Sequence, residues 1–260
     1  MAITAEELMD NAPGLLAYAR SLTHNEDDAQ DLLQDVMLRA IERGGTFRGE
    51  SSLTTWLHRI MHHRHVDLVR HRDPVLVEPE RLAALVERSW RDDTFTVDAG
   101  DVVARAEVRD DLLDALSRLP VILRSAVVLH DVAGMTTAEI AAVQHVGLPA
   151  AKQRLRRGRA ALMHALASDA ERRIEPPAVP LRCWKARVRI DDYLDDALTT
   201  KERRQLEVHL EGCPTCPGLY AAIVGVTDAV GRLRDPDSTV EPTLADRIQR
   251  MLDEAEQHPG

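Results

Sequence analysis

TTAEIAAVQHVGLPAAKQRLRRGRAAL, residues 136–162, predicts two helices joined by a tight turn. Thr136 or Thr137 can cap the first helix, in which Ile140 and Val143 face inward. Pro149 stands in the first turn of the second helix, where its missing N–H is not needed. The second helix is basic, so the pair predicts a helix-turn-helix, which places that helix in the major groove of DNA. The alternative is a solvated basic face on an ordinary helical bundle.

Composition agrees with a helical protein of two or three small domains. Hydrophobic residues make up 44% of the 260 residues and aromatic residues only 3%, which suits helices with aliphatic seams. The net charge is −10, yet residues 58–72 and 152–159 are strongly basic. An acidic chain with two basic stretches indicates one surface for DNA and another for a basic protein partner.

The sequence also indicates where the protein works. It has no apolar stretch of membrane-spanning length, and its acidic start, MAITAEELMD, does not resemble a signal peptide. All three cysteines lie beyond residue 180, which is not the pattern of a secreted disulfide framework. We therefore expect a cytoplasmic protein without a membrane partner.

The helical periodicity predicts three blocks separated by two linkers. Helical spacing of apolar residues fills 1–75, 109–168 and 181–260. We expect a linker at 76–108, with one short helix at most, because of its prolines and the polar run RDDTFTVDAGD. A second linker is expected at 169–180, because ERRIEPPAVP contains three prolines.

Residues 112–162 resemble region 4 of the extracytoplasmic-function sigma factors, the module that reads the −35 promoter element. The matching parts are ALSRLP, AGMTTAEIA and KQRLRRGRAAL, whereas His145 stands where a turn glycine is usual. Ala150 and Ala151 also replace a common Thr-Val pair. Cations on such a helix contact phosphates or guanine edges. The DNA contacts expected from it are Lys152, Gln153, Arg154, Arg156, Arg157 and Arg159.

Residues 27–44, DDAQDLLQDVMLRAIERG, are similar to region 2.2 of the same family. The resemblance implies that this helix docks on the β′ clamp helices of RNA polymerase, with region 4 on the β flap. Its acidic face suits a basic partner, although a solvated acidic face has the same pattern. The polymerase-binding residues expected here are Asp28, Asp31, Leu32, Gln34 and Asp35.

Residues 47–72, FRGESSLTTWLHRIMHHRHVDLVRHR, are similar to regions 2.3 and 2.4, which open the promoter and capture the −10 element. Cations that hold the DNA backbone suit that task. We expect Trp56 in the core, and a metal at His58 and His62 is disfavoured because no cysteine or acidic cluster completes it. The expected DNA contacts are Arg59, His63, Arg64, Arg70 and Arg72, with His63 standing where the family usually has asparagine.

A metal site is predicted by His209, Cys213 and Cys216. The histidine and the first cysteine are one helical turn apart, and the short CPTC loop lets both sulfurs converge. Zinc prefers four nitrogen or sulfur ligands, and Cys183 is the only other cysteine. A thioredoxin-like dithiol is disfavoured because no βαβ pattern precedes CPTC, while a metal-free cysteine cluster remains an alternative.

Residues 189–220 resemble the zinc-containing anti-sigma domain, through YLDDALT and ERRQLEVHLEGCPTC. In that family the fourth ligand lies upstream of the histidine, which implies the set Cys183, His209, Cys213 and Cys216 around Zn²⁺. Whether such an ion is structural or redox-labile is left open by the sequence.

The sequence therefore predicts an all-α protein with a region 2 bundle, a region 4 helix-turn-helix and a small zinc-binding domain. We expect it to bind polymerase core, direct recognition and opening of promoter DNA, and be modulated by contact between its zinc domain and its sigma domains. No nucleophile–base pair or phosphate loop is apparent, so we expect no enzymatic activity. The alternatives are a polymerase-independent helix-turn-helix regulator and an adaptor that sequesters another sigma factor.

Overall fold

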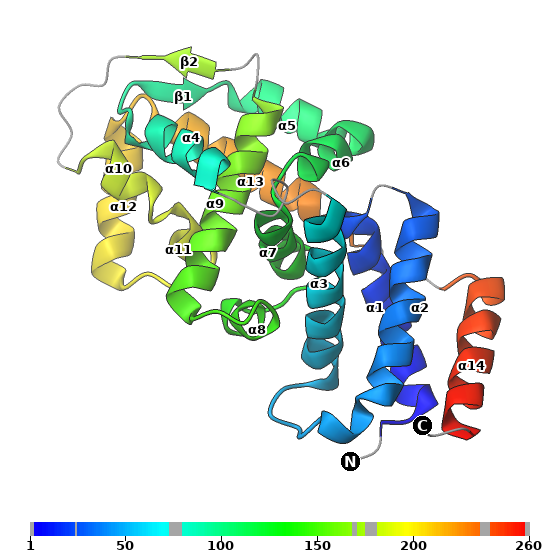
Figure 1. Cartoon of the computed structure of the whole chain (residues 1–260). Helices are drawn as coiled ribbons and strands as arrows, with labels where there is room; N and C mark the ends of the chain where they lie inside the picture. Colours follow the sequence, from blue (N-terminus) through cyan, green and yellow to red (C-terminus); the bar gives the residue numbers. More distant parts are fainter. Residues whose placement is uncertain are drawn as a thin grey trace. The chain divides into compact units, whose positions relative to one another are not determined.

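The computed structural model describes residues 3–23, 25–72, 80–167, 171–174, 181–234 and 240–257 (Figure 1). Within these ranges the regular structure is helical apart from two three-residue strands, which confirms the expected all-α class. The chain divides into two compact units. The first unit contains Met1–Val77, Pro120–Lys152 and Leu233–Gly260, and the second contains Glu78–Leu119 and Gln153–Arg232.

Three long helices form the base of the first unit: α1 (Ala5–Leu22), α2 (Glu26–Glu42) and α3 (Leu53–Arg72). The 3₁₀ turn η1 (Gly44–Thr46) follows α2. Helix α1 begins at a capping box between Thr4 and Glu7, and Asn25 caps α2 by accepting from the amide of Asp28. Aliphatic residues on the facing sides of these helices are fully buried, among them Leu15, Leu33, Met37, Leu57 and Met61.

Two helices of the predicted helix-turn-helix region also belong to this unit. Helix α7 (Val121–Asp131) packs against α1, and α8 (Thr137–Val143) packs against α3. A buried polar cluster joins α7 to α1 and α3. Ser125 Oγ of α7 lies 2.7 Å from the Tyr18 hydroxyl of α1 and 3.0 Å from His62 Nδ1 of α3. Thr136, rather than Thr137, caps α8 through a capping box with Glu139.

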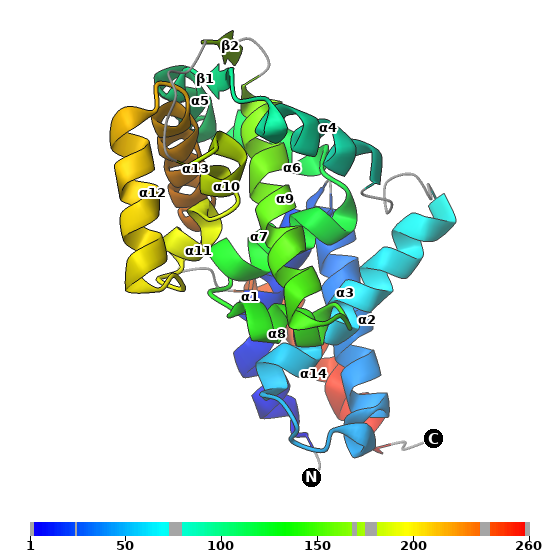
Figure 2. The same ribbon diagram turned by 90° about the vertical axis from the view of Figure 1, so that its left-hand side faces the viewer.

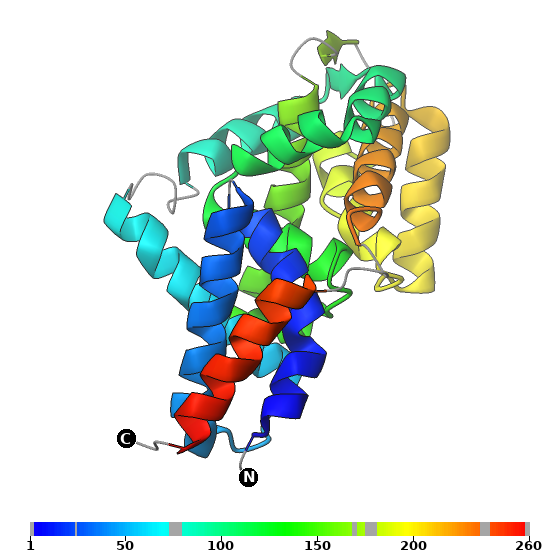
Figure 3. The same cartoon turned by 90° about the vertical axis from the view of Figure 1, so that its right-hand side faces the viewer.

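The last helix, α14 (Pro242–Gln257), packs on α1 and α2 in the first unit (Figure 3). Its buried residues Leu244, Ile248 and Leu252 recur every four positions and form the stripe that contacts the bundle. The final helix of the expected domain at 181–260 is thus grouped with the first unit, and the rest of that domain, up to Arg232, with the second. An apolar stripe of this kind requires a partner surface, which α1 and α2 provide.

The second unit combines the middle of the chain with most of its C-terminal part. It contains most of α9 (Leu148–Leu166) and strands β1 (Phe95–Val97) and β2 (Glu171–Arg173), which pair antiparallel with Phe95 opposite Arg173. The remaining helices of this unit are α4 (Glu80–Arg91), α5 (Ala99–Glu107), α6 (Arg109–Ser117), α10 (Cys183–Arg187), α11 (Ile190–Leu194), α12 (Thr200–Gly212) and α13 (Cys216–Gly231).

Helix α13 lies beside α12 and packs closely against α5 and β1 (Figure 2). A Cβ atom on Gly225 would lie 2.2 Å from Val103 Cγ2, and one on Gly218 would lie 2.9 Å from the Val97 carbonyl oxygen. Glycine is therefore required for this close approach. Within the expected linker at 76–108, residues 80–107 form two helices and a strand, which pack against α10 and α13.

Candidate metal centre and nucleic-acid surfaces

Four predicted metal ligands converge at the junction of three helices in the second unit. Cys183 begins α10, His209 lies in the last turn of α12, Cys213 ends that helix and Cys216 begins α13. Their ligand atoms all lie within 4.8 Å of one another, and all four residues are buried. The structure therefore brings together the complete set that the sequence predicts.

The geometry of this cluster fits a tetrahedral zinc ion. Cys183 Sγ and Cys213 Sγ are 3.7 Å apart, close to the edge of about 3.8 Å expected for zinc–sulfur bonds of about 2.3 Å. Neither ring nitrogen of His209 makes a hydrogen bond of normal geometry to the described residues, although both are buried. Burial also lowers the pKa of His209, which favours the neutral ligand form.

Thr215, between the two cysteines of the CPTC loop, orients the sulfurs. Its hydroxyl oxygen lies 3.3 Å from Cys213 Sγ and 3.8 Å from Cys183 Sγ. Burial raises the pKa of the Cys183 and Cys216 thiols. For Cys213 burial acts in the same sense, but hydrogen bonds from Thr215 and from nearby backbone amides bring its pKa below the usual value. The loop thus stabilises the ionised form of Cys213 relative to that of an ordinary cysteine.

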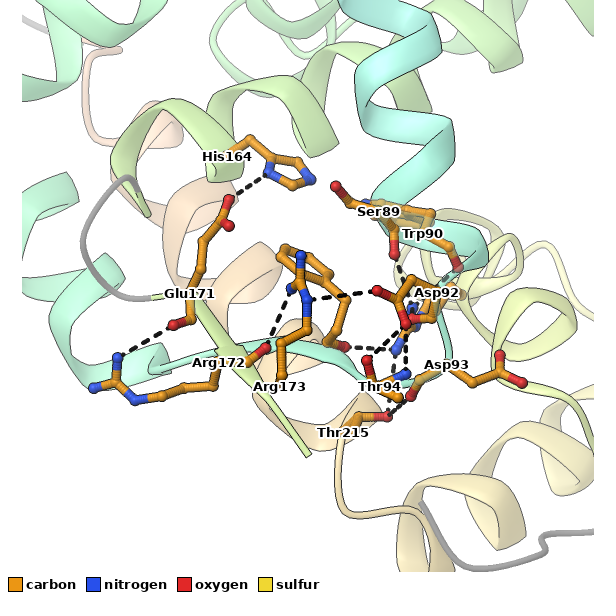
Figure 4. A network of polar contacts seen from close by, with 12 residues as sticks. Ser89, Trp90, Asp92, Asp93, Thr94, His164, Glu171, Arg172, Arg173 and Thr215 are labelled. Atoms are coloured by element: carbon orange, nitrogen blue, oxygen red, sulfur yellow. Dashed lines mark hydrogen bonds and ion pairs between the residues drawn. The ribbon is translucent and has the colours of Figure 1, made fainter. Parts of the chain in front are cut away.

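The CPTC loop is also fixed to the segment between α4 and β1. The Thr215 hydroxyl donates to the Asp93 carbonyl at 3.1 Å, and the Thr96 hydroxyl donates to the Thr215 carbonyl at 2.7 Å. Figure 4 shows Thr215 beside the turn formed by Asp92, Asp93 and Thr94. A fully buried arginine, Arg187, donates to several carbonyl groups of the same turn. The candidate metal centre and residues 89–96 therefore form one polar network.

The predicted DNA-reading helix is α9. It follows a turn in which His145 has a φ of 52°, a left-handed conformation, so histidine occupies the position where glycine is usual. Lys152 and Gln153 are exposed, Arg154, Arg156 and Arg157 are half-buried, and Arg159 is only 3% exposed.

Three of the cations on α9 contact other parts of the second unit. Arg159 Nη1 lies 3.0 Å from Asp191 Oδ1 and 3.7 Å from Asp195 Oδ1, both in or just after α11. Arg157 pairs with Glu87 at 2.5 Å, and the Arg156 guanidinium lies 5.7 Å from the centre of the Trp184 ring. These side chains are therefore engaged by the protein in this conformation.

The predicted polymerase-binding residues are grouped on α2. Four of them, Asp28, Asp31, Leu32 and Asp35, line a groove of about 390 Å³ that also includes Arg64, which pairs with Asp35 at 2.6 Å. Gln34 is not among the residues that line it, and its side chain donates to the Gln30 carbonyl. Because Gln30 also contacts Arg247 of α14, the groove and α14 use different sides of α2.

The remaining DNA-contact candidates lie along α3. Arg59 and His63 are half-buried, the His63 ring packs against His145 at 4.9 Å, and exposed Arg70 lies 3.8 Å from Asp67. The Arg72 side chain lies outside the described residues. Trp56 packs against Phe47, as the sequence predicts.

The possible metal pair on α3 is used in a different way. His58 Nδ1 bonds the Thr54 carbonyl at 2.8 Å, and His62 Nδ1 lies 3.0 Å from Ser125 Oγ. Among the described residues, the cluster of Cys183 and its three partners is the one group that brings three or more potential metal ligands together. The two histidines therefore act as buried hydrogen-bonding groups.

Sequence reasoning missed four residues of these sites: Trp184, Arg187, Asp191 and Asp195. Two features point to them in retrospect. Arg187 stands one helical turn after Cys183, and Asp191 and Asp195 are themselves one turn apart in the segment DDYLD, residues 191–195. Neither spacing identifies the partner, because each partner lies far away in sequence.

Comparison with protein families gives three matches. Residues 8–74 match Sigma-70 region 2, residues 109–162 match Sigma-70, region 4, and residues 185–216 match a zinc-finger family. No helix in the described part of the chain is both long and apolar enough to cross a membrane.

Curated relatives include the ECF RNA polymerase sigma factor SigE of Mycolicibacterium smegmatis, 32% identical over 62% of this chain and 61% of that protein. SigM of Mycobacterium tuberculosis is 33% identical over 57% of this chain and 69% of its own length. The sigma factor RpoE, solved in complex with the anti-sigma factor NepR from Bartonella quintana, aligns with 63% of this chain at 26% identity and a TM-score of 0.45. The similarity to SigM, together with the matches to regions 2 and 4, shows that the chain belongs to the extracytoplasmic-function (ECF) RNA polymerase sigma factors.

Proposed function

We propose that this chain binds RNA polymerase core, directs recognition and opening of promoter DNA, and is restrained by its own zinc-binding module. In this proposal α2 contacts the β′ clamp helices, region 4 contacts the β flap and the −35 element, and α3 contacts the −10 element. In the same proposal the protein catalyses no reaction itself and acts in the cytoplasm, where it meets RNA polymerase core and promoter DNA.

The observation that carries the proposal is the groove along α2. Asp28, Asp31 and Asp35 line it together with Leu32, and Asp35 is paired there with Arg64. The acids that are not paired with Arg64 would attract a basic helix, which would meet apolar side chains of the same groove. Helix α14 leaves this side of α2 open in the first unit, so the proposed polymerase contact does not require α14 to leave.

Restraint is supported by the contacts of the basic face of α9. Three cations that we expect to meet DNA are instead paired with Asp191, Glu87 and Trp184. A phosphate and a carboxylate offer similar acceptors to a guanidinium, so Asp191 competes directly with DNA for Arg159. Fusion in one chain gives the module an effective concentration of roughly millimolar, which keeps a weak contact populated.

The zinc ion has a structural role in this proposal. It joins the ends of α10, α12 and α13, and α10 is only 5 residues long, too short to be stable alone. Because Trp184 belongs to α10 and Asp191 to α11, the next helix along the chain, the metal maintains the surface that holds α9. An external two-electron oxidant such as a peroxide would convert two of the thiolates to a disulfide, be reduced to water and release the ion, which is a route by which restraint is lost.

Direct binding to purified core polymerase tests the proposed activity. Asp31 is exposed on the groove, and Asp10 is an exposed acid on α1 outside it. We expect Asp31→Arg to weaken core binding at least tenfold and Asp10→Arg to leave it within twofold. Equal affinities would remove α2 from the interface, and no binding by the wild-type chain would favour the polymerase-independent regulator or the sequestering adaptor.

A further inference from the structure

Arg187 is the most deeply buried charged side chain in the described part of the chain. It lies at the end of α10 with an exposure of 0%. One terminal nitrogen donates to the carbonyls of Ser89, Trp90 and Asp92 at 3.3, 3.0 and 2.8 Å. The other donates to the Phe95 carbonyl at 2.7 Å and to the Thr215 hydroxyl at 3.3 Å. Its Nε–H has no partner among the described residues.

This arrangement satisfies hydrogen bonds but leaves the charge without a directly paired opposite charge. No ion pair joins Arg187 to a carboxylate of the described residues, whereas buried Arg159 has two acidic neighbours. The carboxylate of nearby Asp92 is 38% exposed, pairs with Arg173 at 3.5 Å and acts on Arg187 through space, without a direct contact. A buried, unpaired guanidinium is strongly destabilising, so a buried arginine is normally matched by an anion. A partly exposed carboxylate without a direct contact balances a fully buried charge only in part, so a second source of negative charge is expected.

The four metal ligands supply it. A divalent ion held by three thiolates and one neutral imidazole carries a single net negative charge, and this charge arises only when the ion is bound and all three thiols are ionised. Thr215 is the bridge, since its hydroxyl accepts from Arg187 and lies beside Cys183 and Cys213. With an ion bound, the metal centre as a whole would thus carry a charge opposite to that of the guanidinium, across one shared hydroxyl group.

We propose that Arg187 is the counter-charge of the zinc centre and couples metal binding to the main chain of residues 89–96, the segment between regions 2 and 4. This inference rests on the proposal that the four ligands hold zinc. With an ion bound, the positive charge of the guanidinium would be balanced, and the buried position in which it donates to these carbonyl groups would become more stable. Without the ion, the buried charge is unmatched, and the segment that Arg187 organises loses part of its stability.

The consequence extends from the metal to the DNA-reading helix. Residues 89–96 include the end of α4 and most of strand β1, and α4 carries Glu87, the partner of Arg157 on α9. Metal occupancy therefore acts on one of the contacts that engage α9. The path runs from Thr215 to Arg187, from Arg187 to the Trp90 carbonyl, and along α4 to the pair of Glu87 and Arg157.

The proposed role of the Arg187 charge is tested by the zinc affinity of the whole chain. The affinity is measured by competition with a chromogenic chelator under reducing conditions. Three variants separate the contributions. Arg187→Gln removes the charge, and Arg187→Lys keeps the charge but loses the planar fork. Arg189→Gln is the matched control, since Arg189 contacts Gln205 at an exposed site two residues away.

We expect Arg187→Gln to lose roughly 10–100-fold in zinc affinity, the range typical of outer-shell partners, and Arg187→Lys and Arg189→Gln to stay within about threefold. If Arg187→Gln binds zinc as tightly as wild type, the proposal is overturned. If wild-type protein binds no zinc, the proposed metal centre itself fails, which is a different outcome.

Hydrogen exchange of wild-type protein, with and without zinc, tests the coupling without relying on a variant that folds poorly. We expect zinc to slow exchange at the amides of 89–96 at least tenfold more than at α1, which lies in the other unit. In Arg187→Lys, which retains zinc, this local protection is smaller. Equal protection of 89–96 in zinc-bound and zinc-free wild-type protein would contradict the coupling.

Discussion

The buried ion pair between Asp191 and Arg159 offers a direct test of restraint by the zinc module. The two side chains are 11% and 3% exposed and meet at 3.0 Å. Asp191→Asn keeps the shape and one acceptor oxygen but removes the negative charge. Arg159 then remains buried with a weaker partner, so the contact between α11 and α9 is destabilised.

The size of the effect follows from the burial of the pair. Removing one partner of a buried ion pair typically costs about 3–5 kcal/mol. Two features reduce this value here. Asp195 remains 3.7 Å from Arg159 and still provides a negative charge. Burial raises the pKa of Asp191, which means that part of the attraction to Arg159 is already used to offset the desolvation of the Asp191 carboxylate. We therefore expect about 2 kcal/mol, which shifts the balance between restrained and open forms about 30-fold.

The assay is binding of the zinc-loaded chain to a mixed-sequence DNA duplex over a range of salt concentrations. We expect Asp191→Asn to bind DNA up to about 30 times more tightly than wild type. The slope of the logarithm of the binding constant against the logarithm of the salt concentration should also be steeper, by about 0.9 for each additional phosphate that the protein neutralises. Asp196→Asn is the control, since it removes the same charge nearby, at a side chain that is 88% exposed. If both variants bind DNA like wild type, Asp191 does not restrain α9.

Three further predictions concern the metal, the packing and the pH dependence of stability. Cys216→Ala should reduce zinc content from about one ion per chain and lower the melting temperature of the second unit, as measured by metal analysis and calorimetry. Gly225→Leu places a side chain where Val103 Cγ2 would lie 2.2 Å from its Cβ, so we expect separation of α13 from α5 and faster proteolysis between residues 80 and 107. Burial lowers the pKa of His58 from 6.5 to about 4. As the pH falls, the His58 imidazole is therefore protonated in the unfolded chain before it is protonated in the folded chain. Stability from this group is thus complete above pH 6.5 and is lost progressively towards pH 4, by about 3 kcal/mol in total. Denaturant titrations of His58→Asn, which retains a donor for the Thr54 carbonyl, should show a weaker pH dependence; an unchanged dependence would assign it to other groups.

Helices and caps were predictable from the sequence because their signals are local. The capping box at Thr136, the acidic face of α2 and the spacing of His209 and Cys213 all lie within one or two helical turns. The four candidate ligands followed from the spacing of His209, Cys213 and Cys216 and, for Cys183, from the resemblance to the anti-sigma domain. Local periodicity was therefore sufficient for the fold class, and short motifs were sufficient to name a cluster that lies together in the structure.

The long-range contacts were not predictable in the same way. Residues 80–107 resemble a linker in sequence because Asp98 and the polar residues around Phe95 belong to caps and turns, while their apolar residues contact α13 more than a hundred residues later. The partner of Arg187 is a row of main-chain carbonyl groups, which leaves no trace in side-chain identity. Likewise, the stripe on α14 indicates that a partner exists but not that the partner is α1 and α2.

Promoter-directed transcription tests the central claim most directly. Cognate core polymerase, sheared genomic DNA and the zinc-loaded chain are combined, and the 5′ ends of the transcripts are mapped for wild type and for Asp191→Asn. We predict discrete 5′ ends that require the chain, at the same positions for both proteins and more abundant for the variant. Transcripts that start at random positions with both proteins, although each is folded and binds zinc, would contradict the assignment of this chain as a working sigma factor.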